Sequence, residues 1–323
     1  MDQNYLMPRE LDLSFPFNYH IQLENTLLSQ SIKKHGILQP IWIVHRAPNH
    51  LIIDGHRRVQ AALNLNFAEI PVQILPEEKF ESLYTKALSI NISTQPLSLI
   101  EKLRAFQIAT QNFSENTQQE VRQILNLTHH RDLNHILDDL NNIPPRLLKY
   151  LHELNVQMRM LTRLLRFSYT KYERWFDLFV NLRFKGNEMV TILEAIEDIF
   201  LRDCLEPDQC YQQLQIADIL QSPRTPQQKI QEIKRKLNDH RYPLLREIQK
   251  KIKEKSDVIE KEFKGKLRIE WDNTLEKPGI VVNIHLPDAD AFSEIWQKLK
   301  NEEIRLQLES LLNHMNKLPE EEP

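Results

Sequence analysis

The segment Asp-Gly-His-Arg-Arg at residues 54–58 offers the clearest chemistry in this sequence of 323 residues. Gly55 has no Cβ, so its backbone can approach an anion closely. Arg57 and Arg58 follow near the expected start of a helix, and guanidinium groups bind phosphate or carboxylate oxygens in a fork. Free N–H groups at a helix N-terminus favour the same ligands. The segment predicts an anion or phosphate site, with two solvated surface arginines as the alternative.

Short helices and strands must position that segment. Apolar residues that recur on one face predict helices at 26–34 and 59–65, and Gly36 suits the end of the first. β-rich runs predict strands at 41–44, 51–53 and 70–75, with a turn at Pro48-Asn49 between the first two. We therefore expect a small mixed N-terminal domain over residues 1–96.

The pattern of apolar, charged and turn residues changes twice in the rest of the sequence. Residues 97–220 are nearly all helical in pattern, with apolar residues three and four apart. A Ser-Pro-Arg-Thr-Pro run predicts a linker at 221–228. Residues 229–323 predict a long charged helix, strands at 266–271 and 280–286, and one last helix at 290–315. The expected class is α+β: a mixed N-terminal domain, an all-α helix-turn-helix-like middle domain and an α-β-β-α C-terminal domain.

Composition excludes several classes of protein. The chain holds only five glycines, which argues against a glycine-rich phosphate loop. Its two cysteines lack zinc-finger spacing, and we assign no metal ligand. No secretory signal pattern or membrane-length apolar run is present, so we expect a cytoplasmic protein without membrane contact. The net charge of -3 means that nucleic-acid binding would need local basic patches.

Three motifs in the N-terminal segment resemble the N-terminal domain of the ParB partition family, within the ParB/sulfiredoxin-fold superfamily. The family patterns S-I-x-x-x-G-x-x-x-P and G-E-R-R-x-x-A are matched by Ser31, Ile32, Gly36, Pro40, Gly55, Arg57, Arg58 and Ala61. A third pattern, E-N-x-Q-R-x-x-L-x-P-I-E, is similar to residues 91–101. The motifs occur in the family's order and span about 80 residues. No cysteine lies near Gly55, which excludes the thiol chemistry of sulfiredoxin.

The resemblance implies CTP as a ligand of this domain. Matched position by position, the nucleotide contacts would be Gly36, Gly55, His56, Arg57, Arg58 and Asn91. Three positions depart from the family: His56 stands in place of a glutamate, Ile90 stands in place of an acid that contacts the metal, and the family arginine after the glutamine is replaced near Thr94. Isoleucine cannot ligate a hard cation, which requires oxygen ligands, so the sequence leaves a role for Mg²⁺ open. We assign no catalytic residue.

A helix-turn-helix is expected next, as in the family, with its first helix at 118–125 and its recognition helix at 129–140. Arg131, Asn134 and His135 could contact base edges or phosphates. The same helix carries Asp132, Asp138 and Asp139, which repel phosphate. The alternative is a helical packing domain that has lost DNA recognition.

Two basic regions lie further along the chain. Residues 145–185 have a surplus of six positive charges, and Arg159, Arg163 and Arg166 are spaced to share one helix face. Residues 224–266 have a surplus of seven, densest around Lys250, Lys251 and Lys253. Such patches suit contacts with a phosphate backbone, and solvated helix faces are the alternative.

The combined prediction is a ParB-like DNA-binding protein of plasmid or chromosome partition or related regulation, associated with the nucleoid. The family resemblance adds a ParA-type ATPase as a partner. The layout of the C-terminal section resembles a dimerisation domain and predicts a homodimer. Two alternatives stay open: a CTP-dependent hydrolase or nuclease on the same fold, and a non-catalytic interaction scaffold.

Overall fold

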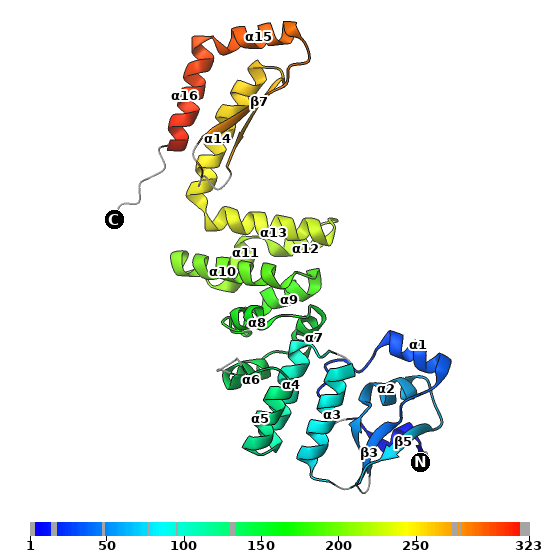
Figure 1. Ribbon diagram of the computed structural model, residues 1–323. Coiled ribbons are helices and arrows are strands. Elements are labelled where there is room, and N and C mark those ends of the chain that lie inside the picture. The colour runs from blue at the N-terminus through cyan, green and yellow to red at the C-terminus, as the bar shows by residue number, and fades with distance from the viewer. Residues whose placement is uncertain are drawn as a thin grey trace. The chain divides into compact units, whose positions relative to one another are not determined.

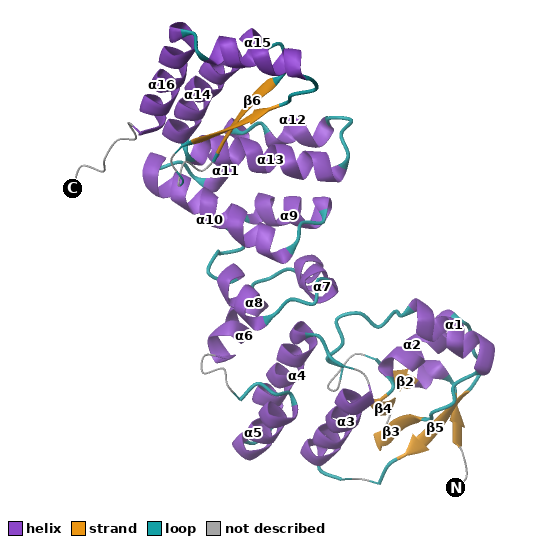
Figure 2. Ribbon diagram, turned by 45° about the horizontal axis from the view of Figure 1, so that its top comes forward, coloured by secondary structure: helices purple, strands orange, loops and turns teal. Residues whose placement is uncertain are grey.

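The computed structural model describes residues 4–13, 18–46, 49–76, 78–94, 96–128, 133–272, 277 and 279–316. It confirms the α+β class, with a small sheet in the N-terminal part followed by helices (Figures 1 and 2). The chain divides into two compact units, one made of residues 1–194, 206–211 and 224–230 and the other of 195–205, 212–223 and 231–323. The domain boundaries expected at 96, 220 and 228 stay predictions.

The N-terminal sheet has five strands in the order β1-β5-β3-β4-β2. β3 pairs antiparallel with β4 and parallel with β5, while β1 and β2 form the edges. The strands are β1 (Asn4–Leu6), β2 (Leu11–Asp12), β3 (Ile41–Arg46), β4 (Asn49–Asp54) and β5 (Ile70–Ile74). The three strands expected from the sequence are confirmed as β3, β4 and β5. The turn predicted at Pro48-Asn49 falls partly outside the described residues.

Helix α2 (His56–Asn64) starts directly where β4 ends. Gly55 makes this corner possible because its φ is 109°, in the left-handed region that favours glycine. A Cβ on Gly55 would also lie 2.8 Å from Cδ1 of Ile41. α2 begins three residues earlier than the periodicity predicted, so Arg57 and Arg58 lie in its first turn.

The sheet is buried on both faces. Val59 and Ala62 of α2 join one apolar core with strand residues, namely Leu11, Ile41, Ile43, Ile52, Ile70 and Val72. Strand side chains alternate between faces, and the buried Leu51 and Ile53 face the other way. On that side α3 (Phe80–Thr94) contacts β4. Helix α1 (Thr26–His35) packs on α2 and ends at Gly36, as predicted, where φ is 72°.

Helices make up the middle of the chain. They are α4 (Leu99–Asn112), α5 (Glu115–Ile124), α6 (Leu133–Asn141), α7 (Pro145–Glu153), α8 (Met158–Leu164), α9 (Glu173–Leu182), α10 (Gly186–Asp203), α11 (Pro207–Gln213) and α12 (Ile216–Gln221). α5 and α6 correspond to the two expected helices of the helix-turn-helix, although 129–132 lie outside the described residues. Their apolar positions are buried, and α4 contacts both.

One prediction in this region, a helix face shared by Arg159, Arg163 and Arg166, is wrong. α8 ends at Leu164, so Arg166 does not share a helix with Arg159 and Arg163. The chain turns there because Phe167 is buried and its N–H bonds to the carbonyl of Leu164.

The C-terminal residues form an α-β-β-α arrangement, but each expected long helix is two helices. α13 (Pro226–Arg241) and α14 (Pro243–Glu262) separate at Tyr242, because a proline lacks the N–H and disfavours helical geometry in the residue before it. α15 (Ala289–Leu299) and α16 (Glu302–Asn316) separate at Asn301, whose side chain accepts the N–H of Glu303 at 3.0 Å. β6 (Leu267–Trp271) and β7 (Ile280–Ile284) form an antiparallel hairpin.

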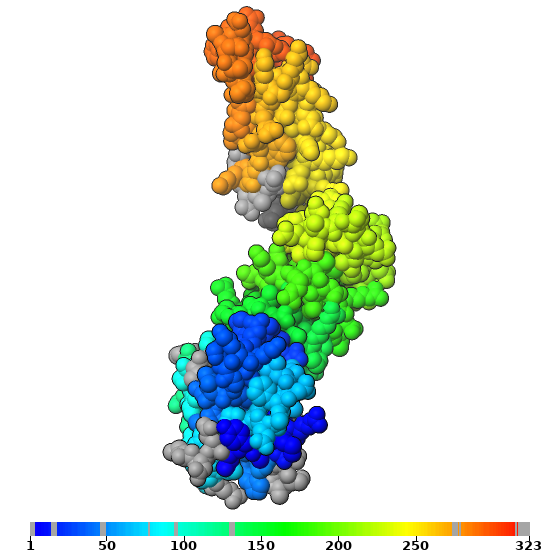
Figure 3. Space-filling model, turned by 90° about the vertical axis from the view of Figure 1, so that its right-hand side faces the viewer, coloured from blue at the N-terminus to red at the C-terminus, as the bar shows by residue number. Residues whose placement is uncertain are grey.

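One apolar core holds these C-terminal elements together. It combines residues of α14, β6, α15 and α16, namely Ile252, Ile259, Phe263, Leu267, Ile269, Ile295, Ile304, Leu311 and Met315. The space-filling view shows the region, in yellow and orange, as one packed surface (Figure 3). Within the described part of the chain, no helix has the length and apolarity required to cross a bilayer.

Candidate functional site

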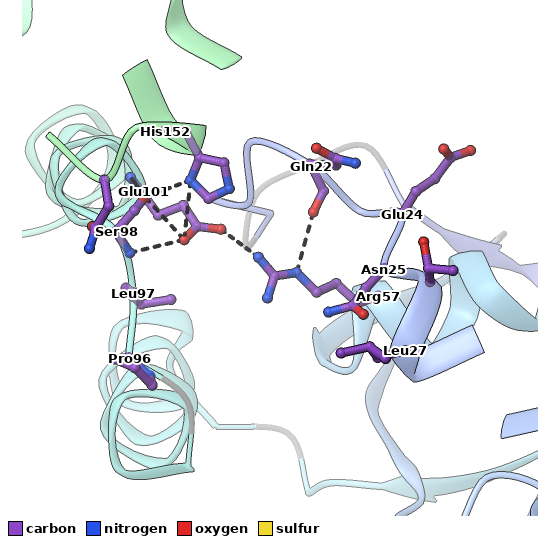
Figure 4. Close-up of a pocket in the computed structure, with 12 residues that line it drawn as sticks. Gln22, Glu24, Asn25, Leu27, Arg57, Pro96, Leu97, Ser98, Glu101 and His152 are labelled. Atoms are coloured by element: carbon purple, nitrogen blue, oxygen red, sulfur yellow. Dashed lines mark hydrogen bonds and ion pairs between the residues drawn. The ribbon is translucent and has the colours of Figure 1, made fainter. Parts of the chain in front are cut away.

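A pocket of about 570 Å³ lies beside Arg57, and its lining comes from four elements (Figure 4). The loop before α1 and the first turn of α1 supply Gln22, Glu24, Asn25, Thr26 and Leu27. The start of α4 supplies Ser98 and Glu101, and the residues just before it supply Pro96 and Leu97. His152 lies on α7, and Asn155 lies just after that helix. The volume lies within the usual range for small-molecule sites.

Arg57 is the cationic side chain of this pocket. Its Nη2 donates to Oε1 of Glu101 at 2.6 Å, and its Nε donates to the carbonyl oxygen of Gln22 at 3.3 Å. The side chain is 14% exposed, so its position is set by these contacts rather than by solvent. Arg57 reaches the pocket because Gly55 turns the chain and α2 presents its first turn in that direction.

Glu101 joins several elements although its side chain is only 3% exposed. It closes the capping box of α4, where its Oε2 accepts the N–H of Ser98 at 3.1 Å. Its Oε1 also lies 3.1 Å from Nδ1 of His20. Nδ1 of His152, on α7, bonds to Oγ of Ser98 at 2.7 Å (Figure 4). One buried carboxylate thus connects α2, the loop at His20 and the start of α4.

The carboxyl group of Glu101 is ionised at neutral pH. Burial alone would raise its pKa, but the hydrogen bond from His20, the charge of Arg57 and the hydrogen bond from the Ser98 backbone outweigh that and lower the pKa to about 2. Burial lowers the pKa of His20 below its usual value. The pocket wall therefore holds one guanidinium and one carboxylate in direct contact.

Asn91 belongs to the same neighbourhood through Tyr19. Burial raises the pKa of the Tyr19 hydroxyl, the charge of Asp54 adds to this, and the nearby Asn91 side chain opposes it. Arg57 and Glu101 also act on that hydroxyl. The structure therefore brings Asn91 and Arg57 into one polar cluster around a buried tyrosine.

Arg58 is held away from the pocket by other partners. Its Nη2 donates to Oδ2 of Asp54 at 2.6 Å, and its Nη1 donates to the carbonyl oxygens of Gln39 and Pro40. It does not line the pocket. The two adjacent arginines thus face different neighbours, unlike the single cradle that their spacing suggested.

The other sequence-predicted positions play supporting parts. His56 is 4% exposed, and burial, with the charge of His20, lowers its pKa to about 3, so the ring is neutral. Gly55 shapes the corner, and Gly36 ends α1; neither lines the pocket. Ile90 is 39% exposed. Among the described residues, no group of three or more histidine, cysteine or acidic side chains could hold a metal ion.

Sequence reasoning did not single out Glu101, Gln22 or His152 as site residues. Glu101 carried a signal, because Ser98 and Glu101 have the S-x-x-E spacing of a capping box and close the third motif. Gln22 contributes a backbone carbonyl, which has no sequence signature. His152 comes from a helix more than fifty residues further along the chain.

Asn134 and His135 are exposed on α6, and Asp138 and Asp139 are exposed on the same helix. Arg131 lies outside the described residues. The acidic pair shares the accessible surface of α6 with the two candidate contacts. DNA recognition by this helix stays a prediction.

The basic residues expected to contact phosphate are mostly accessible. Arg159 and Arg166 are exposed, while Arg163 forms an ion pair with Glu194 at 2.7 Å. Lys250, Lys251 and Lys253 are exposed on α14. Lys251 pairs with Glu247 at 2.7 Å and Lys250 approaches Glu254 at 3.9 Å, and exposed pairs of this kind are weak.

Comparison with known proteins gives a consistent family match for the N-terminal part. Residues 22–89 match the model of the ParB N-terminal domain. A probable chromosome-partitioning protein ParB of Helicobacter pylori is 31% identical over 98 residues, which are 30% of this chain and 33% of the relative. A nucleoid occlusion protein of Halalkalibacterium halodurans is 35% identical over 80 residues, 25% of this chain and 28% of the relative.

These matches span a third or less of each curated relative. Among solved structures, a C-terminally truncated ParB of Caulobacter crescentus complexed with CTP-gamma-S aligns at 17% identity with a TM-score of 0.25. That alignment covers 52% of this chain and 94% of the other. A TM-score this low supports no inference about this chain.

Proposed function

We propose that this chain is a ParB-like DNA-binding protein of chromosome or plasmid partition that binds CTP beside Arg57, because residues 22–89 match the ParB N-terminal domain. The curated relatives named for chromosome partitioning and nucleoid occlusion support the partition role. The observation that carries the nucleotide proposal is the position of Arg57: a guanidinium group in the first turn of a helix, on the wall of a pocket of about 570 Å³.

Several features of the pocket favour a phosphate-bearing ligand. The first turn of α1 lines it next to Arg57, and a helix N-terminus attracts anions. Arg57 has five N–H donors, so it can bind two oxygens of one phosphate. Of the six positions predicted from the sequence, we therefore retain Arg57 as the direct phosphate ligand. Asn91 supports the cluster through Tyr19, and Gly55 and His56 support the corner.

An enzyme is the less favoured alternative. His56, which lies beside Asp54 in the sequence, is buried and does not line the pocket. A general base must come within hydrogen-bond reach of the proton that it takes. We assign no residue to Mg²⁺.

The C-terminal elements support a homodimer as part of the proposal. β7 exposes Val281, Val282 and Ile284, and α15 exposes Phe292 and Trp296, each 36% exposed or more. An exposed apolar strand pairs readily with another chain, and a second copy of this chain would present the same strand. A ParA-type ATPase is the partner that the family resemblance adds.

Calorimetric titration of CTP into the full chain, alone and with a random DNA duplex, tests the nucleotide proposal. We expect Arg57→Gln to weaken binding about tenfold or more, because a hydrogen bond to a charged group contributes about 1.5–3 kcal/mol. Arg9→Gln, an exposed arginine outside the pocket, is the matched control. Absence of CTP binding by the wild-type chain, or equal affinity in the Arg57 variant, would rule the proposal out.

A further inference from the structure

The phosphate ligand of the proposed site already has an anionic partner. The Nη2 of Arg57 that faces the pocket donates to Oε1 of Glu101 at 2.6 Å, within the range of a charge-assisted hydrogen bond (Figure 4). Both residues line the pocket, so a ligand phosphate would approach both together. A phosphate that binds Arg57 meets a carboxylate at the position it would occupy.

Coulomb repulsion makes simultaneous binding of the two anions to Arg57 unfavourable. Two unit charges about 4 Å apart interact by about 4 kcal/mol at the effective dielectric constant of a protein surface. Glu101 is 3% exposed, so water screens it little. Its pKa is lowered, so the carboxylate is ionised at neutral pH.

We infer that Glu101 is a built-in competitor for Arg57, so that a nucleotide binds by exchanging a phosphate oxygen for the Glu101 carboxylate. This inference rests on the proposed function and adds the regulation of that site. Affinity is then set by the difference between two ion pairs on one guanidinium. A ligand with a single weak negative charge gains little from the exchange, whereas a polyphosphate offers several oxygens with which to displace the carboxylate.

The exchange would also change contacts between elements outside the pocket. Glu101 accepts a hydrogen bond at His20 and closes the capping box of α4, and Ser98 of that box bonds to His152 on α7. Once released from Arg57, the carboxylate keeps these other partners. Phosphate binding therefore breaks the contact between α2 and α4 while leaving the first turn of α4 capped.

Arg58 supplies an internal comparison, because it has an equivalent ion pair outside the pocket. Arg58 and Asp54 are also 2.6 Å apart, and their side chains are 17% and 16% exposed. If the accessible arginine is Arg57, loss of the Glu101 charge should strengthen binding, and loss of the Asp54 charge should not. The two neighbouring ion pairs thus separate the two arginines experimentally.

The test is CTP affinity, measured by calorimetry at fixed salt for the full-length wild type and three variants. Glu101→Gln removes the charge but keeps the capping box, which accepts glutamine at this position. We expect it to bind CTP about tenfold more tightly or better than the wild type. Asp54→Asn and Glu81→Gln should change affinity less than twofold. Glu81 is the control because, like Glu101, its carboxylate binds the start of a helix. It accepts the N–H of Ser114, just before α5, at 3.0 Å.

The outcomes separate this inference from the function on which it rests. Wild-type binding with equal or weaker binding by Glu101→Gln overturns the competition and leaves the proposed function standing. A stronger gain in Asp54→Asn than in Glu101→Gln overturns it as well, in favour of Arg58. If neither the wild type nor Glu101→Gln binds CTP, the proposed nucleotide function and the competition both fail.

Discussion

At the scale of single residues, the N-terminal site is built from buried polar groups whose protonation is fixed by their surroundings. Glu101 is held charged by His20 and Arg57, and burial holds His56 neutral. A buried ionisable group of this kind links folding to pH, because the unfolded chain binds protons differently.

His56 gives a signed pH prediction. Its pKa is about 3 in the folded chain, against an ordinary value of 6.5, so the neutral ring contributes its full stability above about pH 6.5 and loses it as the pH falls toward 3. Between pH 7 and pH 5 this contribution should fall by about 2 kcal/mol.

Urea denaturation at the two pH values, followed by the fluorescence of Trp42 in β3 with the other tryptophans replaced, would measure that loss. His56→Gln should lose less stability than wild type over the same interval, by about that amount, while His135→Gln, an exposed histidine, should follow the wild type. Parallel losses in the wild type and the His56 variant would contradict the buried neutral ring.

At the scale of elements, local signals in the sequence predicted what local physics controls. α1 follows from its apolar periodicity and Gly36 stop, and the β3–β4 hairpin and α2 follow from β-rich runs and the Gly55 corner. One failure depends on tertiary packing, whereas the break between α13 and α14 follows from Pro243, a local signal in the sequence. The end of α8 before Arg166 follows from burial of Phe167, and no periodicity at Arg159 and Arg163 signals it.

The site shows the same division between local and long-range information. Arg57 and Gly55 could be found from a short motif, because the turn from strand to helix at Gly55 depends on residues that are adjacent in the sequence. The Glu101 contact joins residues 44 apart, and the bond between Ser98 and His152 joins residues 54 apart. Only the folded chain shows which of two adjacent arginines faces the pocket.

The exposed apolar elements of the C-terminal part lead to a prediction about assembly. Phe292 and Trp296 stack on α15 with ring centroids 6.1 Å apart, and both are about half exposed. Burying large aromatic residues dominates the energy of many interfaces. We expect the double variant Phe292→Ser with Trp296→Ser to shift the chain from dimer to monomer in sedimentation velocity.

The matched control for this assembly is Leu201→Ser, which removes an apolar side chain that is 71% exposed elsewhere in the chain. It should remain dimeric, and circular dichroism should show that all three proteins keep their helices. A wild-type chain that sediments as a monomer at about 50 μM would contradict the homodimer. A double variant that stays dimeric would place the interface elsewhere.

At the scale of the whole molecule, the net charge of -3 gives no overall attraction to DNA. The proposed DNA binding would therefore come from local groups, and these fall into two kinds. Lys250, Lys251 and Lys253 are exposed on α14, where their point charges suit phosphate contacts. Asn134 and His135 are exposed on α6 and have the hydrogen-bonding groups that read base edges.

These two kinds of contact respond differently to salt, and this separates them in one experiment. Each phosphate contact releases counterions, so the logarithm of affinity falls by about 0.9 per contact for each tenfold rise in salt. Replacing the three lysines with glutamine should weaken binding to every duplex and reduce that slope by up to about 3. Replacing Asn134 and His135 with alanine should leave the slope nearly unchanged and reduce only the preference for a specific sequence.

Fluorescence anisotropy with a random duplex and a selected duplex, between about 50 and 200 mM salt, would supply both quantities. The acidic neighbours provide a control of opposite sign: Asp138→Asn with Asp139→Asn should strengthen binding if α6 approaches DNA, since two repulsive charges are removed. An unchanged affinity in that variant would mean that α6 stays away from DNA and that recognition lies elsewhere in the chain. No binding by the wild type even at about 50 mM salt would refute DNA binding itself, because phosphate contacts are strongest when salt is low.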